Sequence, residues 1–183
     1  MYLDRFIEEI NADDVKVEEV SILETQVKYK NKMDNFYSLN EIVVRYKDSK
    51  IVKLDVEIVE KFLERFRGDG LIIATSFGST AHNLSYGGNI VFPDFSTLQI
   101  TPIGPINSKA YSSLNNSIIV PNNRIVKMLP NSSDSDFTVT SDGMIRKYQD
   151  VDYIKTTVAD KKIKQLRMST YSFPSKIQDK NIN

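Results

Sequence analysis

The sequence predicts a mainly β protein, a β-sandwich with one or two short helices. Apolar and charged residues alternate with a period of two, first in VKVEEVSILETQVKYK at residues 15–30, as in half-buried antiparallel strands. Short β-branched runs then recur between turn sequences such as PNN and SDG, which is typical of a sandwich. The 183 residues, 40% of them apolar, suffice for a packed core.

The first half is expected to contain one helix followed by strands. Residues 1–11 have apolar side chains at helical spacing, which predicts a short amphipathic helix. Residues 15–46 are expected to form a hairpin with its turn in NKMDN, at 31–35. The next predicted strands are NEIVVRY and IVKLDVEIV, after which KFLERFRGDG ends in a turn.

The middle of the chain combines a buried strand with a short helix. LIIA, at residues 71–74, is a continuous apolar run and predicts a strand buried on both faces. GSTAHNLSYGG, at 78–88, is the one internal segment predicted to be helical. Ser79 and Thr80 are its candidate N-terminal caps, and Gly87-Gly88 would end it.

The second half is predicted to be rich in strands. The expected strands are TLQITPI, SIIV, RIVKML, DFTVT, MIRKY, DYIKTTV and KIKQLRM. The closing FPSKIQDKNIN lacks periodicity and is expected to wrap the surface. We therefore predict a single domain over residues 1–183, with its core at about 12–170 and a wrapping tail at 171–183.

Composition excludes several classes of protein. Lys+Arg and Asp+Glu both total 24, so the basic field needed for nucleic-acid binding is missing. The sequence has no cysteine and one histidine, so a disulfide framework, thiolate catalysis and a zinc site are not expected. No metal and no cofactor are predicted. No run approaches the roughly 20 apolar residues of a membrane span, and MYLDRFIEEI does not fit a signal peptide. We expect a cytoplasmic protein without a membrane partner.

The stretch GDGLIIATSFGSTAHNLSYGGNIVFP, at residues 68–93, is the main candidate binding segment. A buried strand ending at Thr75 would deliver hydroxyls and free backbone N–H groups to an anion or polar ligand. Gly78 would allow close approach of that ligand. Helix capping by the same hydroxyls is the alternative, and the spacing leaves both open.

Three further positions also have two interpretations. His82 is either a general base or a structural or stacking group, and no triad partner is evident. Asp69 is either a turn aspartate followed by Gly70 at positive φ or a carboxylate at a pocket rim. Asn40 and Glu41 are either strand-end polar residues or a pair that reads an adenine edge and a ribose diol.

Several segments in order resemble the C-terminal domain of the NAD kinase family. They are SLNEIVV, FRGDGLIIATSFGSTAHNLSYGGNIVFP, LQITPIGPIN, SIIVPNN, FTVTSDG and YSFPSKIQD, over residues 36–179. The resemblance implies a β-sandwich that holds most of the NAD site. In that family a separate α/β domain carries the catalytic Gly-Gly-Asp-Gly loop, and we expect that domain to be absent here. RGDG, at 67–70, matches a later Asp-Gly of the family instead.

The resemblance also implies roles for single residues. It places Asn40 and Glu41 at the adenosine, and Asp69 and Gly104 at the nicotinamide end, with the aspartate often supplied by a neighbouring subunit. Phe77 stands where the family has a smaller hydroxyl residue, and His82 stands where it has tyrosine, so the pocket is expected to be reshaped. The expected ligand-binding residues are Asn40, Glu41, Asp69, Thr75, Phe77, Thr80, Ala81, His82, Gly104 and Tyr111.

The sequence is compatible with three functions. The first is a non-catalytic protein that sequesters an adenine-containing, NAD-derived nucleotide, either NAD or a cyclic ADP-ribose-type signal, because nothing replaces the phosphate loop. The alternative is an NAD kinase, alone or completed by a partner chain. The third is a regulatory subunit of a kinase oligomer. Under each we expect a homo-oligomer, a dimer or tetramer, that binds no nucleic acid.

Overall fold

The computed structural model describes residues 2–12, 15–48, 50–107 and 112–181. These residues fall into two compact units. The larger unit is Ser21–Lys161, and the smaller combines Met1–Val20 with Lys162–Asn183.

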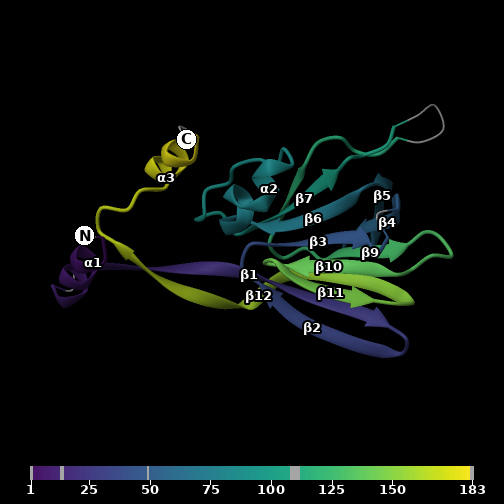
Figure 1. Cartoon of the computed structure of the whole chain (residues 1–183), viewed down its shortest axis with the longest axis horizontal. Coiled ribbons are helices and arrows are strands. Elements are labelled where there is room, and N and C mark those ends of the chain that lie inside the picture. Colours follow the sequence, from purple (N-terminus) through teal and green to yellow (C-terminus); the bar gives the residue numbers. More distant parts are fainter. Residues whose placement is uncertain (1, 13–14, 49, 108–111, 182–183) are drawn as a thin grey trace. The chain divides into compact units, whose positions relative to one another are not determined.

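Twelve strands in the described residues form two six-stranded sheets (Figure 1). In the first sheet the order is β2 (Lys32–Ser38), β1 (Val15–Tyr29), β12 (Val151–Met168), β9 (Val126–Pro130), β4 (Val52–Ile58) and β5 (Lys61–Gly68). In the second the order is β11 (Met144–Tyr148), β10 (Phe137–Ser141), β3 (Glu41–Tyr46), β6 (Gly70–Thr75), β7 (Thr97–Ile103) and β8 (Ile118–Pro121). The predicted mainly β class is confirmed.

The main core draws apolar side chains from both sheets, including Leu54 and Phe66 from the first and Ile42 and Ile73 from the second. Burying each such side chain contributes roughly 1.5–3 kcal/mol before the entropy of ordering is counted. A second, smaller cluster contains Val43, Ile72, Ala74 and Ile103. Val43 and Ile72 alternate along their strands with the main-core residues, so they lie on the opposite face of the second sheet. β6 is therefore buried on both faces, as LIIA predicts.

Two strand predictions need correction. The runs DYIKTTV and KIKQLRM belong to one continuous strand, β12, in which Ala159 between them is buried. The hairpin turn expected at 31–35 is the two-residue loop Lys30–Asn31, with φ of 43° and 59°. Two positive φ values match the twist of a tight hairpin, so β2 begins at Lys32.

The smaller unit contains two helices, α1 (Tyr2–Asn11) and α3 (Phe173–Asn181). The N-terminal helix is as predicted. No helix was predicted in the tail, and α3 forms there because it has its own start signal. Ser172 Oγ accepts a hydrogen bond from the Ser175 amide (3.2 Å), and Pro174 lies in the first turn, where its missing N–H costs nothing. No described helix is both long enough and apolar enough to cross a membrane.

Candidate functional site

The expected ligand-binding residues gather at the two ends of β6. Asp69 immediately precedes this strand, and the loop from Ser76 to Ala81 follows it. A six-residue strand spans roughly 20 Å. We call the group at the C-terminal end of β6 the Asn40 cluster; it consists of Asn40, Glu41, Thr75 and residues 77–82. We call Asp69 and Gly104 the Asp69 cluster.

The Asn40 cluster is joined by hydrogen bonds through Thr75. Thr75 donates its amide to the Asn40 carbonyl (2.9 Å) and its hydroxyl to the Leu39 carbonyl (2.8 Å). The same hydroxyl oxygen accepts from the Gly78 amide (2.9 Å). A Cβ atom at Gly78 would lie 2.6 Å from the Asn40 Cα. Glycine is therefore required for the loop to pack on the Asn40 backbone, and the buried Thr75 side chain supports that packing.

The loop itself is two short helical turns, a 3₁₀-helix η1 (Phe77–Thr80) and α2 (His82–Ser85). The prediction that Ser79 and Thr80 cap a helix is wrong, since neither turn has a side-chain cap. The Ser79 hydroxyl instead bonds the Val91 amide and carbonyl, both at 3.1 Å. Gly87, with φ of 77°, follows the end of α2 as expected. Ser79 thus fixes the loop to the segment after it.

Glu41 is the buried acid of the Asn40 cluster. It is only 6% exposed, and burial together with the charge of Asp142 raises the pKa of its carboxyl to about 7. Its Oε2 atom has no hydrogen-bond partner among the described residues. A buried acceptor without a partner is costly. A ligand that donates hydroxyl hydrogen bonds would satisfy it.

The Asp69 cluster joins two residues that are far apart in sequence. The Asp69 amide donates to the Ile103 carbonyl (2.8 Å). Gly104 has φ of 51°, and a Cβ there would lie 2.9 Å from the Asp69 Cγ. The interpretation of Gly70 as a positive-φ turn residue is wrong. Gly70 is a strand residue, and it must be small because a Cβ would lie 2.6 Å from the Val44 carbonyl oxygen.

A cavity of about 400 Å³ adjoins Asp69, which agrees with a carboxylate at a pocket rim. It is lined by Arg45, Tyr46, Lys50, Asp69, Tyr86 and Ile103. Arg45 Nη2 donates to the Tyr86 hydroxyl (2.9 Å), and the Tyr86 and His82 rings are 5.1 Å apart. Tyr86 therefore links the lining of this cavity to His82. Tyr111, the remaining expected residue, lies outside the described residues.

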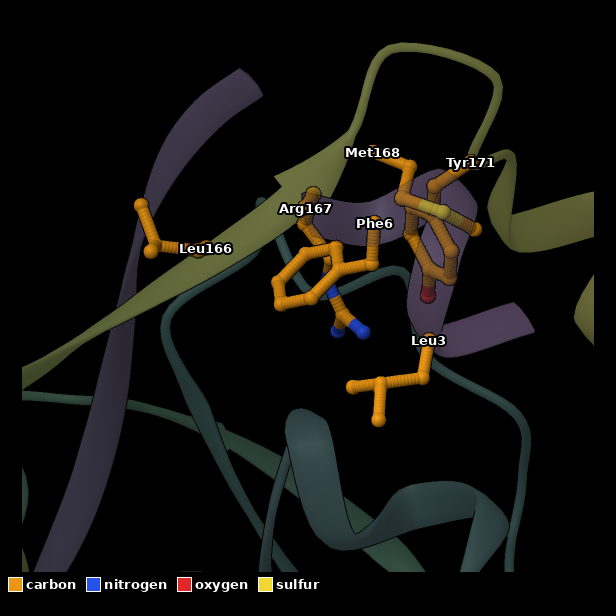
Figure 2. A pocket seen from close by; sticks show the side chains of 6 residues that line it. All are labelled: Leu3, Phe6, Leu166, Arg167, Met168 and Tyr171. Carbon is orange, nitrogen blue, oxygen red and sulfur yellow. The ribbon is translucent and has the colours of Figure 1, made fainter. Parts of the chain in front are cut away.

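An apolar pocket of about 410 Å³ lies within the smaller unit (Figure 2). It is lined by Leu3, Phe6, Leu166, Arg167, Met168 and Tyr171. Its one charged group, Arg167, is ion-paired with Glu18 (3.0 Å) and stacked on Tyr171. Such a lining offers few donors and acceptors for a nucleotide, and it contains no expected site residue. The candidate site is therefore at the ends of β6.

Residues 39–168 match the family described as "ATP-NAD kinase C-terminal domain". The chain belongs to the NAD kinase family. It is 40% identical over 169 residues to the NAD kinase of Finegoldia magna, covering 90% of this chain and 62% of that protein. It is 32% identical to NAD kinase 1 of Oceanobacillus iheyensis, covering 97% of this chain and 67% of that protein. The chain thus spans about two thirds of the length of these NAD kinases.

Two solved structures share the fold. The yeast NADH kinase complexed with NADH has a TM-score of 0.83 and 25% identity, covering 96% of this chain and 51% of that one. The NAD kinase from Archaeoglobus fulgidus in complex with ATP has a TM-score of 0.71 and 19% identity, covering 91% and 61%. The predicted resemblance to a C-terminal NAD kinase domain is confirmed.

Sequence reasoning missed Asn83, which anchors the loop of this NAD kinase domain. Asn83 is fully buried, bonds the Gln99 side chain, and accepts from the Thr101 hydroxyl (2.7 Å). A Cβ at Gly88 would lie 2.5 Å from the Asn83 Cγ. The available signal is the alternation of polar Thr97, Gln99 and Thr101 in β7, a strand that is otherwise buried. Buried polar side chains need such a partner.

Proposed function

We propose that this chain supplies the NAD-binding part of an NAD kinase, the enzyme class that phosphorylates NAD to NADP. The observation that carries the proposal is the Asn40 cluster, within the residues that match the family. There, a turn and a loop that lie far apart in sequence pack against each other beside a buried, unpartnered carboxylate.

In the proposed site the adenosine lies at the Asn40 cluster. Asn40 offers an amide donor and acceptor to the base edge. Glu41, when ionised, accepts hydrogen bonds from ribose hydroxyls. Phe77, Thr80 and Ala81 line the base pocket, and His82 stacks on the base. Asp69 and Gly104 serve the nicotinamide end.

The kinase interpretation has more support than sequestration. The curated relatives described above are named NAD kinases, and no observation on the described residues favours a storage role. Phosphoryl transfer requires ATP, a metal ion and the acceptor hydroxyl to be held together. We assign that task to the part of the NAD kinases that extends beyond the length matched by this chain, whether it acts in the same polypeptide or in a partner.

An assay with NAD, magnesium, and ATP or polyphosphate tests this proposal. The chain is assayed alone and with the separately expressed part of the Finegoldia magna NAD kinase that it does not match. We expect NAD binding by calorimetry, and NADP formation once the second part is added. Asn40→Ala should weaken NAD binding about tenfold or more, because a hydrogen bond in a dry pocket is lost. Tight NAD binding without NADP in any combination would support sequestration and contradict the kinase.

A further inference from the structure

Asp142 lies at the tip of the hairpin between β10 and β11. Its φ is 45° and that of Gly143 is 85°, so the two residues form a tight loop with positive φ at both positions. Non-glycine residues seldom adopt this conformation, although aspartate tolerates it better than most. The loop brings the hairpin tip to the turn between β2 and β3, about a hundred residues earlier in the chain.

The Asp142 carboxylate accepts hydrogen bonds from three consecutive backbone amides. Oδ2 accepts from the Leu39 amide (2.6 Å), and Oδ1 accepts from the amides of Asn40 (2.8 Å) and Glu41 (3.2 Å). The Asp142 amide in turn donates to the Glu41 carbonyl (3.2 Å). Hydrogen bonds to a charged acceptor are about twice as strong as neutral ones. One side chain thus fixes the backbone that presents Asn40 and Glu41.

We propose that Asp142 is a positioning residue of the adenosine site, which orients the Asn40 and Glu41 side chains toward the ligand. This inference rests on the proposed function, because it takes these two side chains to be the ones that contact adenosine. Asp142 itself acts through the Leu39–Glu41 turn. The sequence signal is SDG, an aspartate-glycine loop, which predicts a turn but not its long-range partner.

The charge of Asp142 has a second effect on the site. Asp142, one residue beyond β10, is hydrogen-bonded to the Glu41 backbone on one side, and the uncharged Ala74 of β6 pairs with Glu41 on the other. The loop that packs on Asn40 presents Gly78, Ser79 and Thr80, which are also uncharged. Burial and Asp142 together raise the pKa of Glu41. Removing the negative charge at 142 should therefore lower the pH at which Glu41 ionises.

The test compares Asp142→Ala and Asp142→Asn by calorimetric titration with NAD from pH 5.5 to 8.5. The unaltered chain should lose affinity as the pH falls through about 7, where Glu41 becomes neutral. Asp142→Asn keeps one acceptor oxygen but no charge, so the midpoint of this loss should move to lower pH. Asp142→Ala should bind about tenfold or more weakly at pH 8. A purely structural role would leave the midpoint in place.

Asp150→Ala is the matched control. Asp150 also lies in a short loop at positive φ (52°), here between β11 and β12, which belong to different sheets, but its ion pair is to Lys30. That variant should retain both the affinity and the midpoint. Unchanged affinity and midpoint in Asp142→Asn, with normal NAD binding by the unaltered chain, would overturn the positioning role alone. Absence of NAD binding by the unaltered chain would overturn the proposed function and, with it, this role.

Discussion

Glu41 shows how one residue can favour function at the expense of stability. A carboxylate that is almost fully buried, beside a second carboxylate, is unfavourable in the empty protein. The same burial makes its unpartnered oxygen a strong acceptor once a ligand hydroxyl reaches it. Strained or unsatisfied groups of this kind are characteristic of binding sites.

Glu41→Gln should stabilise the ligand-free protein above pH 7 and weaken NAD binding. The folded pKa of about 7 lies above the ordinary value of 4.5. Between these values the folded state binds more protons than the unfolded state, so the free energy of unfolding falls as the pH rises. In Glu41→Gln this pH-dependent fall in the free energy of unfolding, which amounts to roughly 3 kcal/mol at most, is absent. Urea unfolding at pH 5 and pH 8 measures it, with exposed Glu60→Gln as control. An equal change at both pH values would contradict the assignment.

The loop between β6 and β7 is the element on which the site depends. It is held at one end by the contact of Gly78 with the Asn40 backbone, and at the other by Asn83 packed against Gly88. At both contacts glycine is required because a Cβ atom would overlap the neighbouring residue, and not because the backbone has a positive φ. The loop therefore has little freedom to shift without disturbing the residues that it brings to Asn40.

Gly78→Ala should push this loop away from Asn40. The added methyl group meets backbone atoms, which cannot move as a flexible side chain does, so we expect a loss of about 1–3 kcal/mol of stability and at least tenfold weaker NAD binding. Gly87→Ala is the control, because Gly87 has φ of 77° but no atom within 4 Å of the added Cβ. It should cost about 1 kcal/mol from backbone strain with little effect on affinity. Equal losses of affinity in both variants would contradict the packing argument.

Strands were predicted correctly from the sequence where the alternation or apolar content of neighbouring residues is enough to decide the structure. β7 and β11 coincide with TLQITPI and MIRKY because alternation or apolar content is bounded by clear turns. The α3 helix was missed because its signals are a serine cap and a proline in a polar segment without periodicity. Asp142 and Asn83 were missed for a different reason. Their partners lie in other elements, and no local pattern reports a contact made only in the folded chain.

At the scale of the whole molecule, the two clusters cannot easily serve one ligand within one chain. They lie at opposite ends of β6, roughly 20 Å apart. Between them, Val43, Ile72 and Ala74 are almost completely buried, so these side chains offer a ligand no exposed surface that joins the two clusters. One dinucleotide can contact both clusters if a second copy of the chain supplies one of them. We therefore predict a homo-oligomer with shared sites.

Mixing two defective variants tests the shared site. Asn40→Ala and Asp69→Ala should each bind NAD about tenfold or more weakly, since each removes a hydrogen-bonding group from every site. In a mixed dimer with two-fold symmetry, one site receives both substitutions and the other receives neither. Equal amounts, unfolded and refolded together, should thus restore unaltered affinity in about a quarter of the sites. Refolding each variant separately before mixing is the control. No recovery of high-affinity sites would place Asn40 and Asp69 of the same chain in one site, and a monomer by sedimentation with NAD bound would exclude sharing altogether.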